Sequence, residues 1–144
     1  MRDLKVLLVD DEQDFIETLS ERLESRSLET TLAFGGEEAL EAVREDEPDL
    51  ILLDLKMPGM DGMEVLRQVR KTFPRVQVVM LTGHKSAKAE EEARYLGAYA
   101  YLGKPVELEH LSRILREAFE NCRGSCSSPT REKLPDFSGR FAAS

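Results

Sequence analysis

Four large apolar residues precede a single carboxylate and a turn in the stretch Leu50-Ile51-Leu52-Leu53-Asp54-Leu55-Lys56-Met57-Pro58-Gly59-Met60-Asp61-Gly62. A short, unbroken apolar run of this kind is typical of a strand that is buried on both faces. The proline and glycines of residues 58–62 then predict a sharp turn before the next helix. Asp54 thus stands at the carboxyl end of a strand, where open α/β sheets bind ligands. By itself it fits a helix cap or a turn equally well.

The chain on both sides of this stretch alternates strand-like apolar runs with helix-like patterns. Strands are expected at residues 6–9, 28–34, 50–53, 76–81 and 98–102. Helices are expected at about residues 13–25, 37–45, 63–73, 86–96 and 108–119, where apolar residues recur with a helical period. Strict alternation predicts an α/β fold, in which a doubly wound parallel sheet lies between two layers of helices.

Four of the five expected strands end in side chains that can carry chemistry. In chain order these are Asp10 and Asp11, Asp54, Thr82 and Lys104. Because the carboxyl ends of parallel strands lie along one edge of a sheet, we expect these side chains to gather there. Each of them could separately cap a helix or lie in solvent, but the combination favours a functional site.

The residue types indicate which chemistry such a site performs. Asp10, Asp11 and Asp54 would repel one another unless a cation neutralised them. Oxygen-only ligands with open coordination positions suit Mg²⁺, with Mn²⁺ as a substitute. An ionised carboxylate beside such a cation and a lysine can attack a phosphoryl group. Lys104 would neutralise charge on that group, and the Thr82 hydroxyl would bond one of its oxygens.

The combined pattern resembles the receiver domain of two-component response regulators over about residues 4–120. The motifs that carry the resemblance are Asp10-Asp11, Asp54 with Met57-Pro58-Gly59-Met60-Asp61-Gly62, Thr82, Gly97-Ala98 and Lys104-Pro105. The resemblance implies a flavodoxin-like (βα)5 fold with a parallel sheet of order 2-1-3-4-5. It also implies that Asp54 accepts phosphate from a histidine kinase or from a small phosphodonor.

A metal site is also implied by the resemblance. Asp11, Asp54 and the main-chain carbonyl of Lys56 would hold Mg²⁺, with Asp10 acting through a water. Lys104 would contact the phosphoryl group, and the Lys104–Pro105 peptide bond would be cis, which bonds before proline tolerate.

Switching is the third implication of the resemblance. Thr82 would move toward the phosphoryl group and Tyr101 would rotate inward behind it, remodelling the partner-binding surface of residues 86–119. Tyr101 could instead be a half-buried strand aromatic. By strand period Tyr99 should face the same side of the sheet, so only the resemblance favours Tyr101.

Two variable positions are hypothesised to tune the lifetime of the phosphoryl group. Lys56 and His84 follow Asp54 and Thr82 by two residues and would flank the path of a hydrolytic water. The alternative is a solvated lysine and a loop histidine. His84 has no second ligand at metal-binding spacing, so we do not expect it to hold an ion.

The expected partners follow from the resemblance. They are a sensor histidine kinase or phosphotransfer protein, a downstream effector protein or domain, and a second copy of the chain in a phosphorylation-dependent homodimer. One alternative is a haloacid dehalogenase-type enzyme, but Lys56 stands where such enzymes have a second acid. The other is a phosphorylation-independent interaction module with the receiver fold. We therefore expect a phospho-accepting switch and not an enzyme.

Composition divides the chain into two parts. Residues 121–144 contain four basic and two acidic side chains, which leaves 16 basic and 26 acidic ones and a net charge of −10 in residues 1–120. Such an acidic domain argues against nucleic-acid binding. Residues 1–120 are expected to form the receiver domain and residues 121–144 a flexible linker or C-terminal tail. With neither a signal peptide nor an apolar run of membrane-spanning length, the protein is expected to be cytoplasmic, without membrane partners.

Overall fold

The computed structural model of the protein describes residues 4–127, and the side chains of residues 4–121. Ten elements alternate along this part of the chain: β1 (Leu4–Val9), α1 (Gln13–Glu24), β2 (Leu28–Ala33), α2 (Gly36–Glu45), β3 (Leu50–Leu53), α3 (Gly62–Thr72), β4 (Gln77–Thr82), α4 (Ala87–Tyr95), β5 (Ala100–Gly103) and α5 (Leu108–Ser127). The alternation expected from the apolar patterns is confirmed. No helix in this part of the chain is long and apolar enough to cross a membrane.

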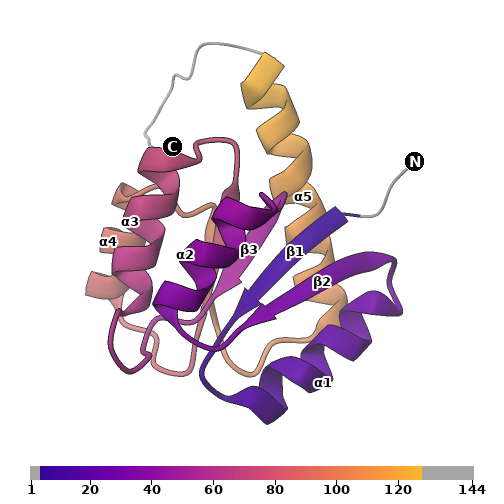
Figure 1. Cartoon of the computed structure of the whole chain (residues 1–144), viewed down its shortest axis with the longest axis horizontal. Helices are drawn as coiled ribbons and strands as arrows, with labels where there is room; N and C mark the ends of the chain where they lie inside the picture. Colours follow the sequence, from indigo (N-terminus) through magenta and orange to yellow (C-terminus); the bar gives the residue numbers. More distant parts are fainter. Residues whose placement is uncertain (1–3, 128–144) are drawn as a thin grey trace.

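The five strands form one parallel sheet in the order β2-β1-β3-β4-β5. This is the flavodoxin-like order 2-1-3-4-5 that the resemblance implied. Strands β2, β1 and β3 are labelled in Figure 1. The central strand β3 pairs with β1 on one side and β4 on the other, and Leu53 lies opposite both Val9 and Met80. The residues that follow β1 and β3 therefore start from the same edge of the sheet.

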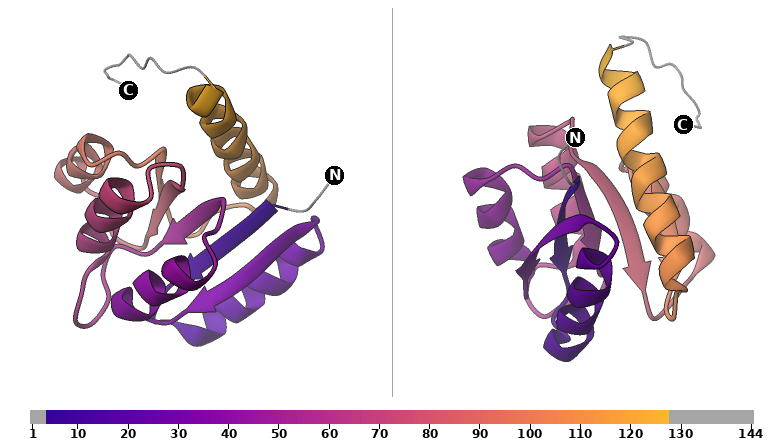
Figure 2. Two further views of the ribbon diagram at one scale, coloured as in Figure 1. Left: turned by 45° about the horizontal axis from the view of Figure 1, so that its top comes forward. Right: turned by 90° about the vertical axis from the view of Figure 1, so that its right-hand side faces the viewer.

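Helices cover both faces of the sheet, because alternate strand residues point to opposite sides (Figure 2). One core packs β-strand side chains such as Leu7, Ile51 and Met80 against α2, α3 and α4. The other packs Leu8 and Leu52 among others against α1 and α5. The four residues of β3 are all buried, as expected for a strand between two helical layers.

Helix α4 is the most weakly anchored of the helices. Ala93 is its one buried residue, with Ala89 and Leu96 packed partly against the core. Tyr95, near its end, is 88% exposed. Little apolar area therefore holds this helix to the sheet, which favours local movement.

Helix α5 extends beyond the boundary expected from composition. It continues to Ser127, whereas residues 121–144 were expected to be a linker or tail. The single Gly124 costs a helix only about 1 kcal/mol, and no proline occurs between Pro105 and Pro129. The remainder of the expected tail, residues 128–144, lies outside the described residues.

The expectation that Tyr99 and Tyr101 face the same side of the sheet was wrong. Tyr101 lies within the core under α4, whereas Tyr99 packs on the α5 side and accepts a hydrogen bond from the Asn121 side chain at 2.8 Å. The physical reason is that Tyr99 precedes β5, which begins at Ala100, so the alternation of the strand does not apply to it.

Candidate functional site

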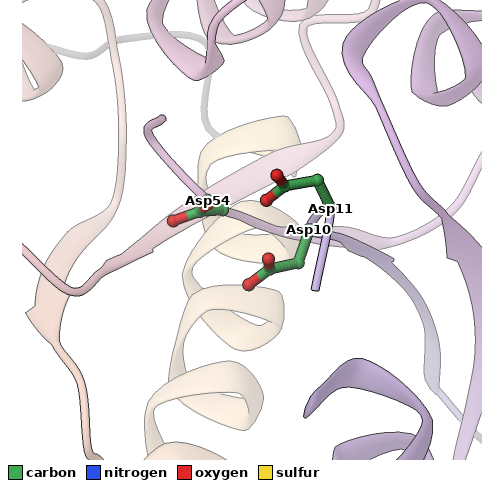
Figure 3. Close-up of side chains that lie close together, drawn as sticks. All are labelled: Asp10, Asp11 and Asp54. Carbon is green, nitrogen blue, oxygen red and sulfur yellow. The ribbon is translucent and has the colours of Figure 1, made fainter. Parts of the chain in front are cut away.

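The carboxyl ends of β1 and β3 bring three carboxylates together (Figure 3). One carboxylate oxygen from each of Asp10, Asp11 and Asp54 lies within 4.8 Å of the others. The main chain fixes this arrangement, because the Asp54 N–H donates to the Val9 carbonyl at 2.9 Å. Asp10 and Asp54 are 2% and 7% exposed, while Asp11 is open to solvent. The cluster thus has two buried acids and one that faces water.

The surroundings of Asp54 disfavour its charged form. The pKa of Asp54 is raised to about 6, mainly by burial and also by the negative charges of Asp10 and Asp11. The nearby Lys104 ammonium and a hydrogen bond from the main chain of Leu55 lower this pKa and offset part of the rise. A cation placed among the three carboxylates would relieve the repulsion and favour the ionised acceptor.

Lys104 reaches into this cluster from the end of β5. Its Nζ lies 2.7 Å from Asp10 Oδ2 and 3.8 Å from Asp54 Oδ1. Burial lowers the pKa of Lys104, but the hydrogen bond to Asp10 and the charge of Asp54 outweigh this effect, so that the pKa rises. The Lys104 N–H donates to the Thr82 carbonyl at 2.8 Å, and the bond to Pro105 is cis. Lys104 is therefore a fixed positive charge beside Asp54.

The turn after Asp54 is held tightly against α3. The Gly62 N–H donates to the Leu55 carbonyl at 2.8 Å. A Cβ atom at Gly62 would overlap the main-chain oxygen of Asp54, so only glycine fits at this position. Asp61 caps α3 by accepting a hydrogen bond from the Glu64 N–H at 3.0 Å. The sequence at residues 57–62 thus fixes the position of the main chain at Asp54.

Thr82 and Tyr101 lie beside this edge and contact the loop that leads to α4. Thr82 is buried, and its hydroxyl accepts a hydrogen bond from the His84 N–H at 3.1 Å. The Tyr101 hydroxyl accepts a longer one from the Ser86 N–H at 3.4 Å. The Ser86 side chain in turn caps α4 by accepting from the Ala89 N–H at 3.0 Å. Thr82 therefore holds the loop that leads to α4, and Tyr101 holds the residue that caps this helix.

The structure brings the acids and the lysine predicted from the sequence to one place. The Lys56 and His84 side chains are exposed. Two residues around Lys104 were not predicted. Glu12 Oε1 lies 3.2 Å from the Lys104 Nζ, and the Phe15 ring centre lies 4.4 Å from it. The sequence feature that could have indicated Glu12 and Phe15 is their position shortly after the Asp10-Asp11 pair, at the start of α1.

The fold and this edge together define a flavodoxin-like domain with an acidic cluster and a lysine at the carboxyl ends of its strands. The family model of the response regulator receiver domain matches residues 6–116, and the chain belongs to this family.

Curated relatives agree with this assignment. Sporulation initiation phosphotransferase F of Bacillus subtilis is 32% identical over 117 residues, which are 81% of this chain and 94% of that protein. Regulatory protein AtoC of Escherichia coli is 33% identical over 116 residues, which are 81% of this chain but 25% of that longer protein.

Solved structures agree as well. A CheY-like receiver domain protein of Methanospirillum hungatei superposes with a TM-score of 0.82 at 28% identity, covering 85% of this chain and 98% of that chain. A receiver domain protein of Clostridium thermocellum gives a TM-score of 0.79 at 32% identity, covering 83% and 97%.

Proposed function

We propose that the protein is a phosphoryl-accepting switch with Asp54 as the acceptor. The observation that carries the proposal is the position of this carboxylate: it is buried at the end of the central strand, clustered with two acids, and 3.8 Å from a lysine ammonium. Asp54 would attack the phosphorus of a phosphohistidine or of a small phosphodonor, forming an acyl phosphate as the donor's leaving group departs. Lys104 would neutralise the charge of the transferred group.

A divalent cation fits the donor set. Asp10, Asp11 and Asp54 supply oxygen ligands only, and their mutual repulsion is what a cation would remove. Asp11, Asp54 and the Lys56 main-chain carbonyl would hold Mg²⁺ or Mn²⁺ directly, with Asp10 acting through a water. When bound, the cation supplies charge neutralisation for the acceptor and the incoming phosphoryl oxygens.

The proposed output is a change at α4, β5 and α5. The Thr82 hydroxyl accepts a hydrogen bond from the His84 N–H. It can bond a phosphoryl oxygen only if it turns away from this N–H. Tyr101 already lies inward and contacts Ser86 at the start of α4. Releasing one of these contacts would loosen a helix that is thinly anchored. Lys56 and His84, both exposed, would tune how long the phosphoryl group survives.

The proposed partners follow from the family. The phosphoryl donor would be a sensor histidine kinase or a phosphotransfer protein in the cytoplasm. The target would be an effector protein or domain, as the additional length of the AtoC relative suggests. A phosphorylation-dependent homodimer through α4, β5 and α5 is a further proposal. The chain would act as a switch that assists its own phosphorylation and dephosphorylation, not as an enzyme with a separate substrate.

The test is intact mass after incubation with Mg²⁺ and acetyl phosphate. We expect one phosphoryl adduct on the native chain, removed by hydroxylamine and absent from Asp54→Asn. Asp14→Asn, an exposed acid on α1, is the matched control and should be phosphorylated normally. Persistent failure to form an adduct, together with failure to bind beryllofluoride, would favour the phosphorylation-independent interaction module.

A further inference from the structure

The Lys104 ammonium has more partners than the phosphoryl chemistry requires. Its Nζ lies 2.7 Å from Asp10 Oδ2, 3.2 Å from Glu12 Oε1 and 3.8 Å from Asp54 Oδ1. It also lies 4.4 Å from the centre of the Phe15 ring, within the range of a cation–π interaction. The acidic cluster accounts for Asp10 and Asp54, but not for Glu12 or Phe15.

Glu12 and Phe15 are placed next to Lys104 by the start of α1. The Glu12 N–H donates to Asp10 Oδ1 at 2.9 Å, which ties the backbone of Glu12 to the acidic cluster. Its side chain makes no helix-capping hydrogen bond. The ring of Phe15, less than one turn later, borders a water-sized cavity that Asp10 and Asp54 also line.

We propose that Glu12 and Phe15 are positioning residues that form a resting seat for the Lys104 ammonium. In this seat Glu12 competes with the phosphoryl group for Lys104. The Phe15 ring packs against Nζ and keeps it near Asp54. Asp10 and Glu12 each accept one of the three N–H bonds of the ammonium, so Glu12 competes by holding the position of Nζ and not by using up its donors. A phosphoryl group on Asp54 would draw Nζ from Glu12 over a short distance.

The size of the effect follows from exposure. The Glu12 side chain is 66% exposed and that of Lys104 is 16% exposed, so their ion pair is partly screened by water. Removing the charge of Glu12 should therefore strengthen phosphoryl-analogue binding by about two- to fivefold. The gain should shrink at high salt, because screening weakens exposed pairs most.

The proposal rests on the proposed function, and beryllofluoride tests it with a matched control. Calorimetry at saturating Mg²⁺ would compare the native chain with Glu12→Gln and with Asp14→Asn. Both variants remove one negative charge near the start of α1, but of the two acids only Glu12 forms an ion pair with Lys104 among the described side chains. We expect tighter binding for Glu12→Gln and a change below about 1.5-fold for Asp14→Asn. Equal changes in beryllofluoride affinity for the two variants would overturn the proposal.

A double-mutant cycle separates the contact from general electrostatics. In a Lys104→Gln background, the gain from Glu12→Gln should disappear, because the competing ammonium is gone. A gain that persists there would contradict the proposal.

A second readout needs no phosphoryl chemistry. In EDTA, the NMR signals of the Lys104 ε-methylene and ammonium should shift in Glu12→Gln and stay unchanged in Asp14→Asn. Lys104 signals that do not shift in Glu12→Gln would overturn the proposal even if beryllofluoride binds. Failure of the native chain to bind beryllofluoride, with the Lys104 signals shifted as expected, would instead count against the proposed function alone.

Discussion

Replacing the acceptor acid should stabilise the protein, and it should do so in a pH-dependent way. Burial and two neighbouring acids raise the pKa of Asp54 from 3.8 to about 6. Asp54→Asn keeps a side chain of nearly the same shape and removes the charge. The variant should therefore be more stable than the native chain at neutral pH.

The sign and size can be worked out from proton linkage. Between pH 3.8 and about 6 the folded chain holds a proton at Asp54 that the unfolded chain has lost. The free energy of unfolding of the native chain therefore falls as pH rises through this window. Each pH unit of difference corresponds to about 1.4 kcal/mol, which gives a loss of about 3 kcal/mol at most. The Asn variant lacks this loss, so the stability difference between the two chains should grow by that amount.

Urea unfolding in EDTA at a series of values from about pH 4 to about pH 7.5 measures the difference. Saturating Mg²⁺ should reduce the difference, because a ligand of the folded state stabilises only the chain that binds it. A difference that stays constant across the pH range, or a less stable Asp54→Asn at neutral pH, would refute the reasoning.

Three further predictions concern the turn, the switch helix and the lifetime of the acyl phosphate. Gly62→Ala should lower the free energy of unfolding, measured with urea, by about 3 kcal/mol or more. The reason is that the added methyl would overlap the Asp54 main chain. The control is Gly35→Ala, whose methyl meets nothing within 4 Å. Ser86→Ala should cost about 1 kcal/mol through loss of the α4 cap and raise amide exchange in that helix. Lys56→Ala should change the rate of dephosphorylation followed by intact mass, and an unchanged half-life would exclude Lys56 from tuning it.

Much of the fold could be predicted from the sequence. A run of four apolar residues before Asp54 indicated a buried strand, and all four residues are buried in β3. Parallel strands share one direction, so residues at their carboxyl ends must meet at one edge. That rule was sufficient to predict from the sequence that Asp10, Asp11, Asp54 and Lys104 lie close together.

Other features depended on where elements end. Tyr99 was expected to follow the alternation of β5, but the strand begins one residue later, so Tyr99 turns toward α5. Composition ended the domain at residue 120, whereas α5 continues to Ser127. Local patterns define the type of an element better than its last residue, because helix ends depend on a few weak interactions.

By itself the sequence determined the order of the elements, the two faces of the sheet and the acids at its edge, because these follow from apolar periodicity and from the direction of parallel strands. Only the tertiary structure decided that Glu12 and Phe15 surround the Lys104 ammonium. These residues are 92 and 89 positions from Lys104 in the chain, and no local pattern links them. Their contact exists because α1 and the end of β5 pack at the same edge, and such distances are set by packing and not by spacing.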